Sequence, residues 1–326
     1  MVRLGAVGLS RSYRRSLREA GWWLVALVET MGFTITRDTP PHLVDRILER
    51  AVEAAHRDGE RLHWVTLGVL SLQKKLKLSG PLLRGTWAAV RGWKQLLPSR
   101  SRVPITKYCL DGVLLVMLAE GRLVEGKERL IWWSAALGSW LSFSCLLRPS
   151  ELLRLRVNDI SFPEVAEVGD VDPGLVVVIR EPKTRRVWKS QFVLSYDGAL
   201  VAWLRWWVAG LPRNALLFSL SRYLWAARLQ MACSRLSLEE CHFTLGSFRS
   251  GGATYMFRQN QNLGALQFAG RWKSATTLQH YLHTAFSAHV MGNLPRDARQ
   301  KLARVLNRKH LLDGPPPFSL QSLLVS

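Results

Sequence analysis

The chain has 326 residues, which is enough for two domains of ordinary size. Apolar residues make up 48% of the sequence, so it can bury a hydrophobic core, and a disordered polyelectrolyte is excluded. Lys and Arg number 45 against 24 Asp and Glu, a net charge of +21. This surplus predicts a polyanionic partner and favours nucleic acid over a basic surface that is merely solvated.

The first long apolar run, Gly21–Phe33, follows the basic segment Arg11–Arg18. The run is too short to span a bilayer, carries Glu29 and has no small-residue cleavage site after it. A buried amphipathic helix is therefore favoured over a signal peptide. We expect an intracellular protein with no membrane partner.

Three further helical runs are predicted within the first hundred residues. They cover His42–His56, Leu62–Leu78 and Leu82–Leu97. The last of them alternates basic residues with Trp87 and Trp93. This pattern indicates a solvated basic face with the tryptophans in the core, or a basic face that contacts phosphate. The two interpretations are compatible, since the tryptophans can be buried while the basic side chains meet phosphate. The basic residues expected to contact nucleic acid are Lys74, Lys75, Lys77, Arg84, Arg91 and Lys94.

The segment Pro98–Pro104 is polar, basic and bounded by prolines, as is typical of a linker. It predicts a helical domain over residues 1–100, a second domain over 101–295 and a C-terminal tail over 296–326. In the second domain we expect helices over Lys107–Glu120, Lys127–Leu147 and from Gly198 to about Ala288. Strands are expected over Leu155–Phe162, Gly174–Arg180 and Val187–Leu194. The fold class predicted is α+β, mainly α, with a small antiparallel sheet.

Several kinds of site are not indicated by the sequence. It has neither a G-x-x-x-x-G-K-[ST] loop nor a G-x-S-x-G motif, and its carboxylates are scattered, unlike the clustered ligands of two-metal nucleases. His280 and His283 form an H-x-x-H without a second ligand pair, so no metal is expected. The cysteines lack C-x-x-C pairs and predict buried free thiols in a reducing compartment; they are Cys109, Cys145, Cys233 and Cys241.

Two arginines stand in local patterns that would fix their positions. Arg148 precedes Pro149, which suits the first position of a helix, with Glu151 at the third. Taken alone, this pattern also fits a surface arginine near a helix cap. Arg249 precedes the small-residue run S-G-G-A-T, which would let a helix pack closely.

From about Arg102 to Ala288 the order and spacing of motifs resemble the catalytic domain of the tyrosine recombinases, the phage-integrase superfamily. Arg148 with P-S-E-L-L after it resembles the first arginine motif, and Arg249 with S-G-G-A-T resembles the second. Lys183 falls where the family carries a lysine in a β-hairpin. The run G-R-W-K-S-A-T-T-L-Q-H-Y-L-H resembles the segment from the family's His/Trp position to its nucleophile, and its G-R-W form is more similar to eukaryotic retroelement members.

The resemblance implies a mechanism in which Tyr281 attacks a DNA phosphate and forms a 3′-phosphotyrosine. Arg148 and Arg249 would bind the phosphate oxygens, and Lys183 would protonate the leaving 5′-oxygen. Trp272, nine residues before the tyrosine, would shape the pocket. The family scheme further implies double-stranded DNA as substrate, an N-terminal domain that clamps it, self-association on DNA, no cofactor or ATP, and a nuclear location in a eukaryote.

One position departs from the family pattern. The family usually has a histidine three residues before the second arginine, where this chain has Gly246; His242 is four residues away from that position. A relative that binds DNA without cutting it is therefore the first alternative. A helical nucleic-acid binder with chance matches is the second, and it would lack the hairpin around Lys183. A type IB topoisomerase-like enzyme is the third.

Overall fold

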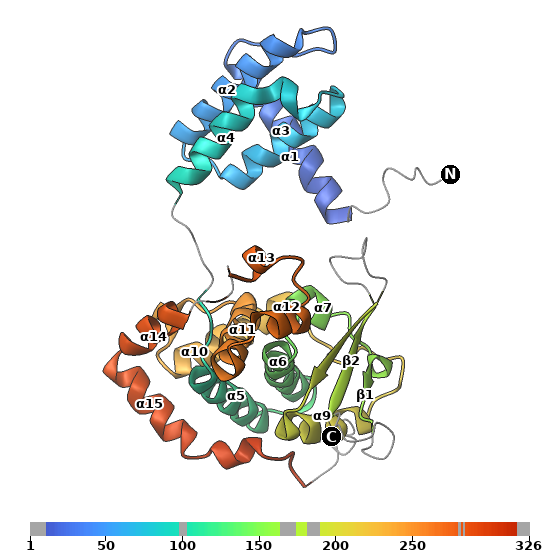
Figure 1. Ribbon diagram of the computed structural model, residues 1–326, viewed down its shortest axis with the longest axis vertical. Helices are drawn as coiled ribbons and strands as arrows, with labels where there is room; N and C mark the ends of the chain where they lie inside the picture. The colour runs from blue at the N-terminus through green and yellow to red at the C-terminus, as the bar shows by residue number, and fades with distance from the viewer. Residues whose placement is uncertain are drawn as a thin grey trace. The chain divides into compact units, whose positions relative to one another are not determined.

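The computed structural model describes residues 11–97, 103–163, 174–180, 190–279, 282 and 284–317. The chain divides into two compact units, Met1–Arg100 and Ser101–Ser326 (Figure 1). Among the described residues, no helix combines the length and the apolar character needed to cross a membrane.

The first unit is a bundle of helices in which α1 packs along α3 and α2 packs along α4. The helices are α1 (Arg11–Thr30), α2 (Pro41–Arg57), α3 (Leu62–Lys75), the short 3-10 helix η2 (Gly80–Leu83) and α4 (Arg84–Leu96). Its core contains Leu24, Leu48, Val65 and Trp93. The run Gly21–Phe33, predicted to be a buried amphipathic helix, forms the C-terminal part of α1, with Leu24 and Val28 buried.

Asp45 on α2 fixes the start of α4. Its carboxylate accepts hydrogen bonds from the backbone N–H groups of Gly85 (2.9 Å) and Thr86 (2.8 Å) and from the Thr86 hydroxyl (2.7 Å). Burial alone would raise the pKa of Asp45, but these hydrogen bonds outweigh it and hold the pKa below its usual value. A negative charge at this helix start is also favoured by the helix dipole.

The second unit is built around α6, whose residues Ile131 to Phe143 are all buried. Its first helices are α5 (Lys107–Arg122), α6 (Gly126–Ser144), the single turn α7 (Pro149–Leu152) and the 3-10 turn η3 (Val157–Asp159). The later ones are α9 (Gly198–Ala209), α10 (Arg222–Arg235), η4 (Glu239–Cys241), α11 (Leu245–Asn260), α12 (Leu263–Gly270), α13 (Ala275–Gln279), α14 (Thr284–Gly292), α15 (Arg296–Leu306) and η5 (Lys309–Leu312). Figure 1 shows α5 and α6 surrounded by the other elements of this unit.

One antiparallel sheet lies at the edge of the second unit, with strand order β1-β2-β3 (Figure 1). The strands are β1 (Ile160–Ser161), β2 (Leu175–Ile179) and β3 (Gln191–Ser195). Val177 pairs with Ile160 on one side and with Val193 on the other. The prediction of a mainly α fold with a small antiparallel sheet is confirmed, and so is the pairing of the two predicted hairpin strands. The turn between them, 181–189, lies outside the described residues.

Residues 296–312 do not form the tail that was expected. Helix α15 packs against α5, and Leu302 is fully buried there. Lys309 forms an ion pair with the buried Asp111 (Nζ–Oδ2 2.9 Å), and the Trp203 indole donates a hydrogen bond to the Leu312 carbonyl (3.0 Å). This strongly basic segment also carries an apolar stripe, in which Ala298 and Leu302 are buried and Val305 and Leu306 pack partly buried against the core.

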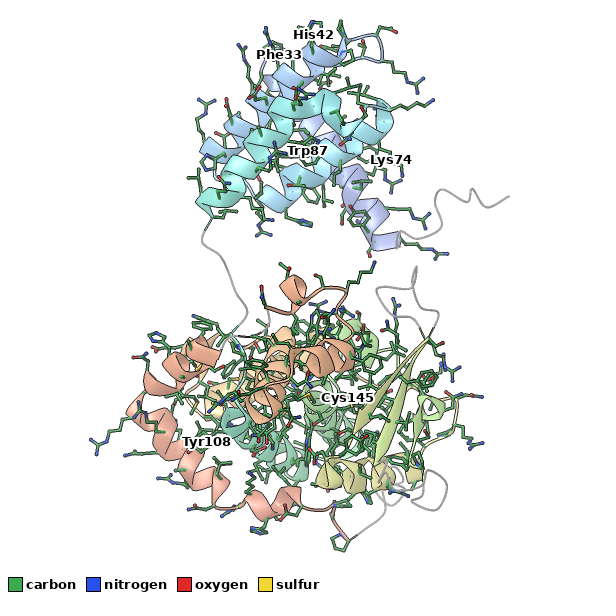
Figure 2. The ribbon with its side chains drawn as sticks, in the orientation of Figure 1. Phe33, His42, Lys74, Trp87, Tyr108 and Cys145 are labelled. Atoms are coloured by element: carbon green, nitrogen blue, oxygen red, sulfur yellow. The ribbon has the colours of Figure 1, made fainter. Side chains whose placement is uncertain are left out.

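The expectation of buried free thiols is confirmed for all four cysteines. Burial raises the pKa of Cys145 and of Cys233 to about 12, and that of Cys109 to about 11. These thiols are therefore protonated and poor nucleophiles at neutral pH. Cys145 lies inside the second unit (Figure 2).

Helix α11 approaches α6 closely because it carries two adjacent glycines. A Cβ placed on Gly252 would lie 2.1 Å from the Phe143 carbonyl oxygen, and one on Gly251 would lie 2.1 Å from the Ile105 carbonyl oxygen. Both neighbours are backbone atoms, which cannot rotate away. The small-residue run therefore sets the position of Arg249 on this helix.

Replacing Gly252 with alanine is expected to lower the free energy of unfolding of the second unit by about 1–3 kcal/mol, because α11 must shift away from α6. Gly198 is the matched control, since a Cβ there meets nothing within 4 Å. Chemical denaturation of Gly252→Ala and Gly198→Ala variants measures both. Equal stability of the two variants would contradict the close packing described here.

Candidate active site

Arg148 is held at the start of α7. Pro149 occupies the first turn of that helix, and the Glu151 carboxylate turns back to accept a hydrogen bond from the Arg148 backbone N–H (Oε2, 2.9 Å). The same carboxylate forms an ion pair with the Arg148 guanidinium (Nη1–Oε1 2.6 Å). The side chain of Arg148 is 20% exposed, so the guanidinium remains accessible while its orientation is fixed.

Arg249 reaches the same place from α11 and is 2% exposed. Its Nη1 donates to the Leu146 carbonyl, and its Nη2 donates to the Gly270 carbonyl (2.5 Å). The guanidinium carbon lies 4.5 Å from the centre of the Trp272 ring, a cation–π contact. Arg249 thus joins the loop before α7 to the end of α12, which are far apart in the sequence.

Trp272 is buried at 5% exposure and packs with Leu146, Leu266 and Leu278. Its backbone N–H donates to the Gln267 carbonyl (3.0 Å), which closes the turn after α12. A Cβ on Gly270 would lie 1.5 Å from the Trp272 ring, so this turn requires glycine there. Trp272, which was predicted to shape the pocket, lies against Arg249 in the structure.

A third arginine, Arg271, lies at the same place, and sequence reasoning did not single it out. Its Nη2 forms an ion pair with Glu151 (Oε2, 3.0 Å) and donates to the Leu146 carbonyl (3.1 Å). Its side chain is 6% exposed. Arg271 is the arginine of the G-R-W motif. From the sequence alone it cannot be told from an ordinary basic surface residue, because its burial depends on the turn after α12.

The four charged groups of this cluster are the guanidiniums of Arg148, Arg249 and Arg271 and the carboxylate of Glu151. Burial alone would raise the pKa of Glu151, but the charges of Arg271 and Arg148 outweigh it and lower the pKa. Three cations against one anion leave an excess of positive charge in a largely buried setting. Such an excess favours the binding of an anion.

The two other predicted catalytic residues, Lys183 and Tyr281, lie outside the described residues, as do His280 and His283. The structure does describe the strand that precedes the Lys183 turn. At its end Arg180 pairs with Asp159, which is 3% exposed and also accepts a hydrogen bond from the Arg156 backbone N–H (2.8 Å). Asp159 therefore acts as a structural anchor for the end of β2.

A pocket of about 290 Å³ adjoins the cluster on the side of the sheet. Its lining includes Glu151 and Asp159 together with Arg154, Arg156 and Arg180. These three arginines add to the positive charge around Arg148 and were not among the predicted site residues. The alternation L-R-L-R after α7 contains Arg154 and Arg156, and Arg180 directly follows β2.

Gly246 occupies the position at which the resemblance to tyrosine recombinases implies a histidine. Gly246 is buried in the first turn of α11, and His242 lies before that helix with its side chain exposed. Neither residue is among the hydrogen-bond partners described above for the arginine cluster.

In the first unit all six predicted DNA-contacting residues are exposed, whereas Trp93 is buried and Trp87 half-buried in the core. Lys74 and Lys75 line a pocket of about 370 Å³ together with Arg14 and Arg18 of α1. Lys74 lies at the edge of the unit, and Trp87 lies among its helices (Figure 2). The pocket is therefore lined by four cationic side chains and by apolar residues that include Trp22. The guanidinium carbon of Arg18 lies 5.6 Å from the centre of the Trp22 ring.

No protein-family model and no curated protein matches the sequence. Solved structures do match. The Tn1549 transposon integrase in complex with transposon right end DNA is 12% identical, with a TM-score of 0.55 over 93% of this chain and 96% of that one. The XerH site-specific recombinase in a post-cleavage complex is 14% identical, with a TM-score of 0.51 over 79% of this chain and 72% of that one. With its hairpin, its arginine cluster and these likenesses, the chain has the fold of the tyrosine recombinases.

Proposed function

We propose that this protein cleaves and rejoins DNA strands in site-specific recombination or integration, through a 3′-phosphotyrosine on Tyr281. The observation that carries the proposal is the convergence of Arg148, Arg249 and Trp272, from the start of α7, from α11 and from the turn after α12, on one positively charged cluster. Its fold is shared with recombinases solved in complex with DNA, which supports double-stranded DNA as the substrate.

In the proposed step, the phenolate oxygen of Tyr281 attacks the phosphorus in line, and the bond from phosphorus to the 5′-oxygen breaks. Lys183 gives the leaving 5′-oxygen its proton. Arg148 and Arg249 stabilise the charge that accumulates on the non-bridging oxygens, because their guanidiniums match phosphate geometry and remain charged. Rejoining reverses the step when a 5′-hydroxyl attacks the phosphotyrosine, so no ATP is consumed.

Arg249 has to exchange partners in this scheme. With 2% exposure and two carbonyl acceptors, its guanidinium is covered by the turn Gly270–Trp272. Contact with a phosphate therefore requires that the Arg249 guanidinium release the Gly270 carbonyl when DNA binds. Arg148, at 20% exposure, would meet the phosphate first.

A relative that binds DNA without cutting it is the second candidate, and Gly246 is the observation that favours it. Without a histidine at that position, one donor to the phosphate is lost. Such a protein would retain the basic surface of the first unit and the arginine cluster.

The proposal is tested by incubating the protein with a library of random-sequence nicked duplexes and recovering DNA that remains bound after denaturation. We expect adducts in which the protein is on the 3′-end and the other end is a free 5′-hydroxyl that a kinase can label. Adducts on 5′-ends would contradict the proposed polarity. DNA binding without any adduct would favour the binding-only candidate.

Replacing Arg249 with lysine is expected to slow cleavage by about 100-fold, since one ammonium group cannot replace a fork of donors. Arg258, which is exposed near the end of the same helix, is the matched control. Single-turnover cleavage of a captured DNA site by Arg249→Lys and Arg258→Lys variants measures both effects. Wild-type cleavage by the Arg249→Lys variant would remove Arg249 from the phosphate site.

Replacing Lys74 and Lys75 with alanine is expected to weaken DNA binding for all sequences. The slope of log affinity against log salt should fall by about 1.8, since each lost phosphate contact removes about 0.9. Arg37, in the loop between α1 and α2, is exposed and outside the basic pocket, and Arg37→Ala serves as the control. Fluorescence anisotropy over a series of salt concentrations measures the slopes; an unchanged slope in the double variant would place these lysines away from the DNA.

A further inference from the structure

We infer that Arg271 is a positioning residue that holds both phosphate-binding arginines in place, Arg148 through the Glu151 carboxylate and Arg249 through the Leu146 carbonyl. The inference rests on the proposed function, since it assigns the cluster to phosphate. It adds a role for a residue to which the motif resemblance assigned none.

The two oxygens of Glu151 are divided between the arginines. Oε1 accepts from the Arg148 guanidinium (2.6 Å), whereas Oε2 accepts from Arg271 (3.0 Å) and from the Arg148 backbone N–H (2.9 Å). Because Arg271 occupies Oε2, the carboxylate cannot rotate to bind two nitrogens of the Arg148 guanidinium, one with each oxygen. Arg148 is therefore held by one nitrogen and keeps the rest of its fork for a phosphate.

The second connection runs through a single backbone carbonyl. The Leu146 oxygen accepts from Arg271 Nη2 (3.1 Å) and also from Arg249 Nη1. Leu146 adopts the left-handed backbone conformation (φ +50°), which sets the direction of its peptide at the end of α6. Any displacement of Arg271 thus removes a neighbour that fixes the place of Arg249.

The local backbone also distinguishes Arg271 from an ordinary cap residue. It follows α12 with φ +58°, a left-handed conformation that glycine adopts at no cost and that is unfavourable for arginine. Its side chain is nevertheless buried, and its buried Nε has no hydrogen-bond partner among the described residues. The contacts of its Nη groups with Glu151 and with the Leu146 carbonyl explain why an arginine occupies this unfavourable, buried position.

The test uses Arg271→Gly, which relieves the backbone strain at this position, and Arg271→Lys, which restores the charge. Arg129 is the matched control. Like Arg271 it donates hydrogen bonds to backbone carbonyls, in its case from Nε to Gly121 and Val124, but it lies outside the cluster. The first readout is the Nε–Hε resonance of Arg148 in ¹⁵N NMR spectra of the full chain, identified by its loss in Arg148→Lys. The second is the single-turnover cleavage rate at saturating DNA.

We expect Arg271→Gly to shift and broaden the Arg148 resonance and to slow cleavage at saturating DNA at least 10-fold. Arg271→Lys should recover part of both, and Arg129→Lys should change neither. An Arg148 resonance that is unaltered in Arg271→Gly would overturn the inference. If the wild type cleaves no DNA, the proposed function fails, yet the resonance still decides whether Arg271 positions Arg148.

Discussion

Replacement of Glu151 with alanine is expected to lower the free energy of unfolding of the second unit by about 3–5 kcal/mol, the range for breaking a buried ion pair from one side. Glu151 is 3% exposed and is paired with Arg148 and Arg271. Its removal would leave the nearly buried Arg271 guanidinium beside a like charge with no anion to offset it. The same change frees the backbone N–H at the start of α7.

The matched control is Glu128→Ala, which breaks the surface ion pair with Arg228. Glu128 is 54% exposed, and pairs of this kind contribute only about 0–1 kcal/mol. Urea denaturation of the two variants gives the comparison. A Glu151→Ala variant as stable as Glu128→Ala would show that the cluster does not depend on this carboxylate.

The free energy of unfolding at acidic pH should include a contribution from Glu151. Its folded-state pKa is lowered, so its contribution is complete above the unfolded value of about 4.3 and is lost as the pH falls through the folded value. Wild-type stability is therefore expected to fall below about pH 4.3, and the Glu151→Gln variant should show a shallower fall there. Denaturation curves between neutral pH and acid measure the difference; parallel curves for the two proteins would contradict the assignment.

The sequence predicted the parts of the cluster whose placement depends on local chemistry. Pro149 with Glu151 two residues later predicted a helix start that aims Arg148, and α7 has that form. The alternating apolar residues of β2 and β3 predicted the hairpin strands, whose pairing counts against an all-helical binder with chance motif matches. These features depend on residues close together in the chain.

The parts that escaped prediction depend on contacts between distant segments. Arg271 becomes a site residue only because the turn after α12 meets the loop that ends α6, which no periodicity reveals. The burial of Arg249 behind Trp272 likewise requires the tertiary fold. Helix α15 was missed because its apolar residues, from Ala298 to Leu306, are interspersed with charged ones.

The central claim is that Tyr281 carries the covalent bond to DNA, and one measurement tests it most directly. Wild type, Tyr281→Phe and the control Tyr255→Phe, a partly exposed tyrosine on α11, are incubated with the same captured nicked duplex. Without its hydroxyl, position 281 has no nucleophile. We predict denaturation-resistant adducts with wild type and Tyr255→Phe, none with Tyr281→Phe, and equal DNA affinity for all three. An adduct that persists in Tyr281→Phe would contradict the account.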